Sequence, residues 1–360
     1  NSNQLFFKNN SDEDFKILIE KIYNGKIGAV INYNADPVFH FESNLDFKNA
    51  YKKLKNVITF CEELNDTAEL STFVLPINHQ LESWGIYNSK SNVYSFQQPV
   101  ISPIFNTRQK EGILEYWMTN LSKKYDEFSY YNYVRTFFNK EIYPLISTSS
   151  NSNDVWNNCL HDGIMSLTTP VNSQIVADFS KTPNPIIVED SKFTVLLEKN
   201  YFILDGKLAN NGWLQEIPHP ISKIMWDNYA AISPNTAKKY NLELNDVVEL
   251  SYKNKKIDIA VCVQPGVADN LAVIELGYGR DIVGEVGKDV GVNANKLINY
   301  GTINSFLIAN VKIVKTGKTY KLATSQEHHP VDDPLTKELH RSRNIIQEGT
   351  VIQYKKNKNI

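Results

Sequence analysis

The first part of the chain carries alternating helical and extended hydrophobic patterns. Polar capping residues precede the first helical pattern and Gly25 follows it, as expected at helix ends. Because strands alternate with helices, we expect a parallel sheet with helical crossovers. The segments concerned are a helix between Ser11 and Gly25, a strand over 27–32, a helix over 46–54, a strand over 56–61 and a strand that ends at Pro76.

The middle of the chain is aromatic and helical, and its periodicity predicts helices over 107–124 and 126–142. Pro144 ends this pattern, and we interpret the aromatic stripe as core rather than as a cofactor site. Residues 180–191 contain two prolines, Pro183 and Pro185, and extended segments, so we place the domain boundary there. The predicted domains are an α/β domain with a helical insert over 1–185 and a β-barrel domain over 186–360.

The second half reads as short strands separated by turn signals, which is typical of a closed barrel. The predicted strands are 193–199, 201–204, 229–232, 246–252, 256–263 and 271–276. One brief helix interrupts them, with Ser233 as N-cap and Pro234 at its first position. We expect the barrel to bury Val247, Val248, Ile257, Ile259, Val261 and Val273.

Composition and charge exclude several classes of protein. The 360 residues carry a net charge of -2, so the chain lacks the basic surplus of a nucleic-acid-binding protein. No apolar run is long enough to span a bilayer. The three cysteines form no metal-binding or iron–sulfur spacing. Since the chain begins at Asn1 and its first Met is Met118, we expect it to be a piece of a longer protein.

The block over 229–279 carries a resemblance to a known family. A strand leads into the Ser-Pro-capped helix, and a strand, a hairpin, Pro-Gly and a strand that ends in Gly-Tyr-Gly follow. This order resembles the dinucleotide-binding domain of the molybdopterin oxidoreductase (dimethyl sulfoxide reductase-like) family. The resemblance implies a double-psi β-barrel for this half. In the first half, Asn34–Pro37 and Asp66–Pro76 are similar to loops of the same family.

Some stretches, including 75–85, 93–109 and 323–329, look like one branch of that family. That branch is the large iron–sulfur subunit of bacterial alternative complex III, a quinol:electron acceptor oxidoreductase whose molybdopterin-like part lacks the cofactor. The resemblance implies export to the periplasmic face of the inner membrane. It also implies assembly with heme and integral membrane subunits, and iron–sulfur clusters in a domain downstream of this piece.

The same resemblance marks candidate cofactor-contacting residues, which we interpret as the remnant of a pterin site. They are Asn34, Asp36, Asp66, Glu82, Asn293, Asn295, Thr324, Gln326, His328 and His329. The residues themselves leave alternatives open. The loop over 324–329 could instead pack against a neighbouring domain, and the Asn residues of 291–295 could simply cap a turn. For His79 with Glu82, and for His161 with Asp162, structural hydrogen bonding is the preferred interpretation. No catalytic residue or metal ligand is predicted.

Loops 34–37, 79–85, 291–295 and 324–329 should converge on one cleft between the two domains. Trp84, His328 and His329 are expected to narrow that cleft below the size of a dinucleotide. Two functions remain: a cofactor-free scaffold part of an electron-transfer subunit, or a fragment of an enzyme that binds molybdopterin guanine dinucleotide.

Overall fold

The computed structural model describes residues 12–41, 47–90, 92–119, 124–146, 148–167, 192–298, 306–326 and 349–356. The predicted domain boundary near residue 185 therefore lies outside the described residues, and so do His328 and His329. Within the described ranges, no helix is both long and apolar enough to cross a membrane.

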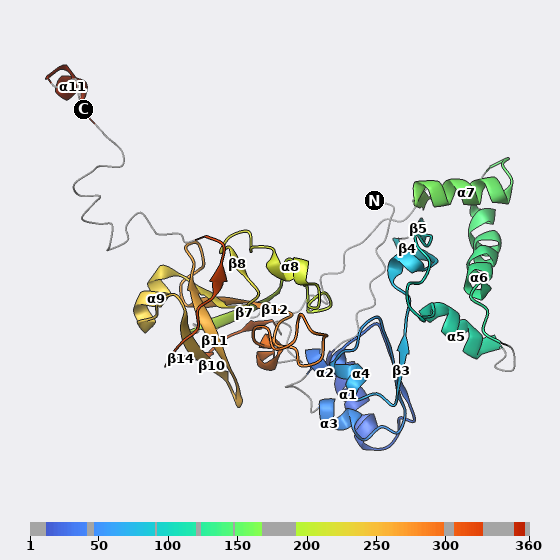
Figure 1. Cartoon of the computed structure of the whole chain (residues 1–360), viewed down its shortest axis with the longest axis horizontal. Helices are drawn as coiled ribbons and strands as arrows, with labels where there is room; N and C mark the ends of the chain where they lie inside the picture. The colour runs from blue at the N-terminus through green and yellow to red at the C-terminus, as the bar shows by residue number, and fades with distance from the viewer. Residues whose placement is uncertain are drawn as a thin grey trace, which may run out of the picture.

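The first unit is a three-stranded parallel sheet in the order β1-β2-β3, which confirms the predicted parallel arrangement. Its central strand is almost entirely buried, as the continuous apolar run of a central parallel strand predicts. The strands are β1 (Val30–Tyr33), β2 (Val57–Cys61) and β3 (Phe73–Pro76), and the helices are α1 (Asp12–Tyr23), α2 (Pro37–His40), α3 (Phe47–Tyr51) and α4 (Asp66–Glu69). The apolar faces of α1 and α3 pack together in one core, and Figure 1 shows these elements grouped at the blue end of the chain.

A second, mostly helical unit follows. Its antiparallel sheet has the order β4-β5-β6, and Phe96, Phe138 and Trp156 form the centre of its core. The prediction that the aromatic stripe forms core is confirmed for Phe138, whereas Phe128 is 70% exposed. Its elements are η1 (Gln80–Glu82), β4 (Gly85–Lys90), β5 (Val93–Gln97), α5 (Lys110–Thr119), α6 (Ser129–Phe137), η2 (Phe138–Ile142), η3 (Tyr143–Leu145), α7 (Ser152–Asp162) and β6 (Ile164–Ser166).

The third unit is built on a curled, seven-stranded mixed sheet in the order β13-β7-β12-β9-β11-β10-β14. Its strands are β7 (Thr194–Lys199), β9 (Ala230–Ile232), β10 (Asp246–Tyr252), β11 (Lys255–Val263), β12 (Leu271–Leu276), β13 (Leu307–Ile308) and β14 (Lys312–Thr319). Around it lie α8 (Gly212–Glu216), β8 (Ile224–Met225), α9 (Pro234–Tyr240), η5 (Ala294–Leu297) and β15 (Ala323–Thr324), while α11 (Val351–Lys356) lies near the C-terminus.

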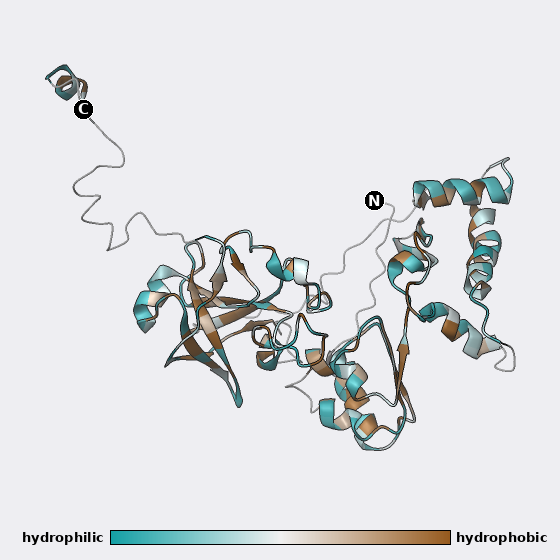
Figure 2. Ribbon diagram, in the orientation of Figure 1, coloured by the Kyte–Doolittle hydropathy of each residue, from teal (hydrophilic) through white to brown (hydrophobic). Residues whose placement is uncertain are grey.

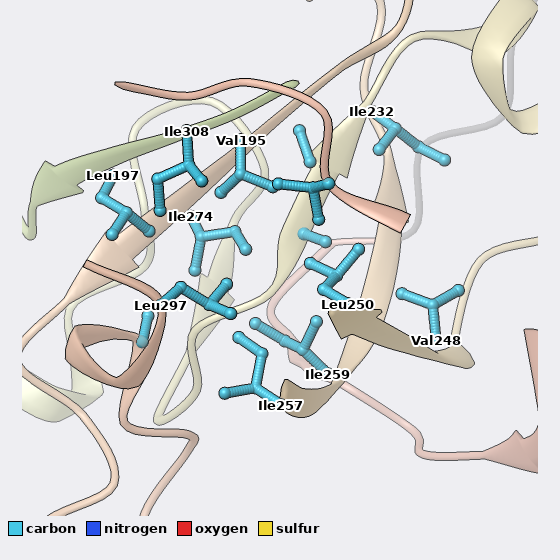
Figure 3. Close-up of a cluster of buried hydrophobic side chains, with 14 of the residues drawn as sticks. Val195, Leu197, Ile232, Val248, Leu250, Ile257, Ile259, Ile274, Leu297 and Ile308 are labelled. Atoms are coloured by element: carbon cyan, nitrogen blue, oxygen red, sulfur yellow. The ribbon is translucent and has the colours of Figure 1, made fainter. Parts of the chain in front are cut away.

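Alternation along the strands explains the core of this unit. Val248, Ile257, Ile259 and Val261 are buried, as predicted, and their side chains meet inside the sheet (Figure 3). The burial predicted for Val247 and Val273 is only partial. Each directly follows or precedes an inward-facing residue, and neighbouring side chains of a strand point to opposite faces. Figure 2 shows hydrophobic positions, in brown, along the strands of this unit.

For this half of the chain, the predicted strand over 201–204 is wrong and the predicted Ser-Pro-capped helix is confirmed. Residues 201–204 form turns rather than a strand, because the Asn200 side chain accepts hydrogen bonds from the backbone of Phe202 and Ile203. The Ser-Pro signal is confirmed: the Ser233 side chain accepts a hydrogen bond from the Thr236 backbone and caps α9. The strand pairings of the described residues support a curled mixed sheet, and the double-psi connectivity stays a prediction.

Candidate functional site

A cleft of about 860 Å³ lies between the parallel sheet and the third unit. On one side it is lined by the loops that follow the three parallel strands: Asn34–Pro37 after β1, Cys61–Asn65 after β2 and His79 after β3. On the other side lie residues 205–208 and 210–213, together with Arg280 and Val283. The cleft is therefore at the carboxyl edge of the sheet, where open α/β folds place their ligands.

Arg280 lines this cleft and joins the two halves of the chain. Its guanidinium, which is nearly inaccessible to solvent, donates to the carboxylate of Asp36 and, over 3.2 Å, to that of Asp66. A second nitrogen, Nη1, donates to the carbonyl of Gly206 at 2.9 Å. The guanidinium also lies over the ring of Phe39, 4.4 Å from its centroid. One cation thus holds two carboxylates of the sheet domain against the other half.

Local structure positions the two carboxylates before Arg280 reaches them. Asp36 Oδ1 accepts hydrogen bonds from the backbone nitrogen of Thr67 at 3.0 Å and from its hydroxyl at 2.7 Å. Asn65 caps α4 by accepting a hydrogen bond from the backbone of Ala68, which fixes the start of that helix beside Asp36. The loops after β1 and β2 are therefore tied together.

Gly206 allows two backbone segments of the third unit to pack closely together. Gly206 has a φ of 100°, and a Cβ atom there would lie 2.8 Å from the carbonyl oxygen of Gly277. That oxygen is backbone and cannot swing aside as a flexible side chain does. Gly206 is thus required both by its backbone conformation and by the close packing that brings its own carbonyl to Arg280.

Burial and neighbouring charges change the pKa of one carboxylate of the cluster and of one thiol beside it. Burial raises the pKa of Asp66 to about 6, and the neighbouring Asp36 adds to this rise while Arg280 opposes it. Arg280 also has a buried Nε atom without a hydrogen-bond partner. Burial, with added repulsion from Asp36 and Glu62, raises the pKa of the Cys61 thiol to about 11, so it is a poor nucleophile.

The cleft carries more negative than positive side chains. Four carboxylates line it, from Asp36, Glu62, Glu63 and Asp205, against the cations Lys207 and Arg280. Arg280 is already bound by carboxylates. A pterin dinucleotide brings a diphosphate, which needs cations or exposed backbone N–H groups. The lining residues therefore do not fit a diphosphate-bearing cofactor well, and in the described residues no cluster of three His, Cys, Asp or Glu side chains could hold a metal ion.

The sequence-predicted residues are only partly brought together. Asn34 and Asp36 line the cleft, and Asp66 lies directly beside it in the ion-pair cluster. Glu82 is instead a structural residue of the second unit: its carboxylate accepts hydrogen bonds from the backbone of His79 at 2.9 Å and of Ile104 at 3.0 Å. The structural interpretation of His79 with Glu82 therefore agrees with the geometry.

The described residues of the loops from the second half of the chain, 291–295 and 324–326, do not line the cleft as expected. Asn293 and Asn295 are buried, and the Asn293 side chain caps η5 by accepting a hydrogen bond from the Asn295 backbone. Thr324 belongs to β15, which pairs with β8, and its hydroxyl donates to the exposed Gln326 carbonyl. None of these four residues lines the cleft.

The prediction that Trp84 narrows the cleft is wrong. Its ring packs against Tyr131 in the core of the second unit, with ring centroids 4.7 Å apart. Trp84 directly precedes β4, and its backbone is fixed by hydrogen bonds to the Gln109 side chain. The indole is thus held within the helical unit rather than at the carboxyl edge of the parallel sheet.

Sequence reasoning missed Arg280, the central residue of the site. A signal existed, because Arg280 directly follows the Gly-Tyr-Gly turn at the end of a predicted strand. Its partners, however, lie more than 200 positions away, and no local spacing connects them. Asp205 and Lys207 sit in what reads as an ordinary turn.

The chain is similar to known proteins over one segment of sequence and in its fold. No family model matches the chain. A segment of 89 residues is 28% identical to the thiosulfate reductase molybdopterin-containing subunit of Salmonella typhimurium, covering 24% of this chain and 12% of that protein. The fold resembles that of acetylene hydratase from Pelobacter acetylenicus, with a TM-score of 0.55 and 12% identity.

The two similarities differ in extent. The structural match covers 83% of this chain but 46% of the hydratase, so the chain spans about half the length of that protein. Together with the sequence match, it supports a molybdopterin-oxidoreductase-like chain. The fold is therefore of the α/β kind seen in the hydratase.

Proposed function

We propose that this chain is a cofactor-free, molybdopterin-oxidoreductase-like scaffold within the iron–sulfur subunit of a membrane quinol oxidoreductase complex. The observation that carries the proposal is the cluster of Asp36, Asp66 and Arg280. At the carboxyl edge of the sheet, where a ligand would otherwise be held, these charged groups pair with one another. The surplus of carboxylates in the rest of the cleft adds to this argument.

The wider setting follows from the resemblance of stretches such as 75–85 and 93–109 to alternative complex III. In this proposal the chain works at the periplasmic face of the inner membrane. Iron–sulfur clusters reside in a downstream domain, and heme and integral membrane subunits are the neighbours. The chain itself holds those neighbours in place and performs no chemistry.

One observation favours the alternative, a fragment of an enzyme that binds molybdopterin guanine dinucleotide. The cleft volume of about 860 Å³ lies within the range of ligand pockets, roughly 300–1,000 Å³. Size alone permits such a ligand, whereas charge opposes its diphosphate.

A calorimetric titration of the purified chain with guanosine diphosphate separates the two functions. The scaffold predicts no saturable heat up to millimolar nucleotide, because carboxylates in the cleft repel the diphosphate. Elemental analysis should find neither molybdenum nor iron at one equivalent per chain. Micromolar affinity, equivalent to about -8 kcal/mol, together with stoichiometric molybdenum in the protein from its own cells would replace the scaffold with the molybdenum enzyme.

A further inference from the structure

Trp213 is an exposed indole beside the cleft. Its side chain is 83% exposed, yet the residue lines the cleft on the side of the third unit. Its backbone is fixed at the start of α8, because the Asn211 side chain accepts a hydrogen bond from the backbone nitrogen of Leu214 at 3.3 Å. Tryptophan is highly buried on average in folded proteins. An indole left open to solvent beside a cavity of about 860 Å³ is therefore an aromatic surface available to a ligand.

The sheet side of the cleft also carries aromatic surface. Phe15 and Phe41 line it, both half-buried, with ring centroids 4.5 Å apart. Aromatic rings attract cations to their faces, and apolar surfaces pack against the hydrocarbon stems of long basic side chains. The two sides of the cleft together suit a group that joins a cation to an apolar stem.

The charge of the lining residues favours the same kind of ligand. The carboxylates of Asp36 and Asp205 each already form an ion pair. Glu62 and Glu63 are exposed in the loop after β2, and no ion pair among the described residues includes either of them. Lys207 can offset only one of these two charges. The lining is thus left with an excess of one negative charge, which a single cation neutralises.

We propose that the cleft binds one organic cation, a guanidinium or ammonium group on an apolar stem. Glu62 and Glu63 pair with its charge, and Trp213 packs against it. A metal ion fits less well, since the described residues contain no group of three metal-binding side chains. The cation belongs either to an Arg or Lys side chain of a neighbouring subunit or to a free small molecule, and its chemistry is the same in both. This inference rests on the proposed function in one respect, namely that no dinucleotide fills the cleft.

Calorimetric titration of the purified chain with N-acetyl-arginine amide tests the proposal. We expect saturable heat at one site per chain. N-acetyl-citrulline amide is the matched probe, because it replaces the guanidinium with an uncharged urea group of similar shape. It should bind about tenfold more weakly, since a charge-assisted hydrogen bond is roughly twice as strong as a neutral one.

Variants of the lining residues assign the binding to the cleft. E62Q/E63Q keeps the shape of both side chains and removes their charge, so it should weaken binding of the arginine probe about tenfold. W213A removes the indole and should weaken binding of the arginine probe to a similar degree, about tenfold. The control E216Q/D258N removes two exposed carboxylates that do not line the cleft, and it should bind the arginine probe as the wild type does.

The outcomes are separable from those of the proposed function. Absence of saturable heat with the arginine probe, equal binding of the citrulline probe, or unchanged affinity of E62Q/E63Q would overturn the cation site. If neither guanosine diphosphate nor the arginine probe binds, the scaffold stands and the cation site fails. If the nucleotide binds with micromolar affinity, the cofactor-free scaffold fails, whatever the arginine probe does.

A measurement in the cells that produce the protein identifies the source of the cation. Leu208 lines the cleft and is 38% exposed, so Leu208→p-benzoylphenylalanine in the full-length protein can capture a neighbouring chain. A protein adduct that E62Q/E63Q abolishes identifies a subunit as the source. A small basic molecule released from the purified protein, and absent from E62Q/E63Q, identifies a free ligand. Finding neither would overturn the proposal.

Discussion

At the scale of single residues, the pKa of Asp66 is set by opposing effects: burial and Asp36 raise it, and Arg280 lowers it. Asp66 shares Arg280 with Asp36, so two carboxylates pair with one cation, and all three side chains are largely buried. Its pKa, raised to about 6 mainly by burial, means that the folded protein holds the proton more tightly than the unfolded chain does. Neutral Asp66 is therefore the form that folding favours.

The first prediction concerns the pH dependence of stability. Between pH 4 and pH 6 the folded state binds more protons at Asp66, so the stabilisation from this group should be lost as pH rises through about 6. D66N keeps an acceptor for Arg280 but cannot ionise. Urea unfolding at pH 4.5 and pH 7.5 should show the variant gaining stability relative to wild type at the higher pH. As a control, D258N removes an exposed carboxylate that faces Lys318 rather than a histidine, and its stability difference from wild type should not show the same gain. A relative stability of D66N that is independent of pH would contradict the raised pKa.

At the scale of elements, the long strands β10 and β11 and the Ser-capped helix α9 of the third unit were predictable because their signals are local. Alternating burial identifies β10 and β11, and the Ser233-Pro234 pair identifies the start of α9. The site was predictable only in part. Asn34 and Asp36 follow a recognisable strand, but the pairing of Asp36 with Arg280 depends on how two halves of the chain come together. The prediction for Trp84 was wrong for the same reason, since its ring packs against Tyr131 in the core of the second unit.

The second prediction tests the register of β10. Val248 is fully buried, whereas the adjacent Val247 is half-buried on the opposite face. V248D places a carboxylate in an apolar core and should lower the free energy of unfolding by about 4 kcal/mol. V247D is the matched control and should cost much less, because its side chain retains access to water. Thermal and urea unfolding of both variants measures the difference, and equal losses would show that the strand has another register.

At the scale of the whole molecule, the two halves of the chain meet through few described polar contacts. Beside the Arg280 cluster, His40 Nε2 lies 3.3 Å from the carbonyl oxygen of Asp205. Among the described residues, a buried ion-pair cluster therefore joins the two halves beside the cleft. Buried charges of this kind set a relative orientation strictly, because each depends on its partners to compensate its lost hydration.

The last prediction follows from that dependence. R280M removes the cation and leaves Asp36 and Asp66 facing each other, so the variant should lose about 3–5 kcal/mol of stability. D36N/R280M removes one of the stranded charges and should recover part of the loss, giving a clear coupling energy between the two positions. R280K keeps the charge but loses the planar fork that reaches both Asp36 and the carbonyl of Gly206, so it should fall between wild type and R280M. Small-angle scattering should show the halves of R280M moving apart, since the variant loses the buried ion pairs that join them. Additive losses in the double variant, with an unchanged scattering profile, would mean that Arg280 is not what holds the halves together.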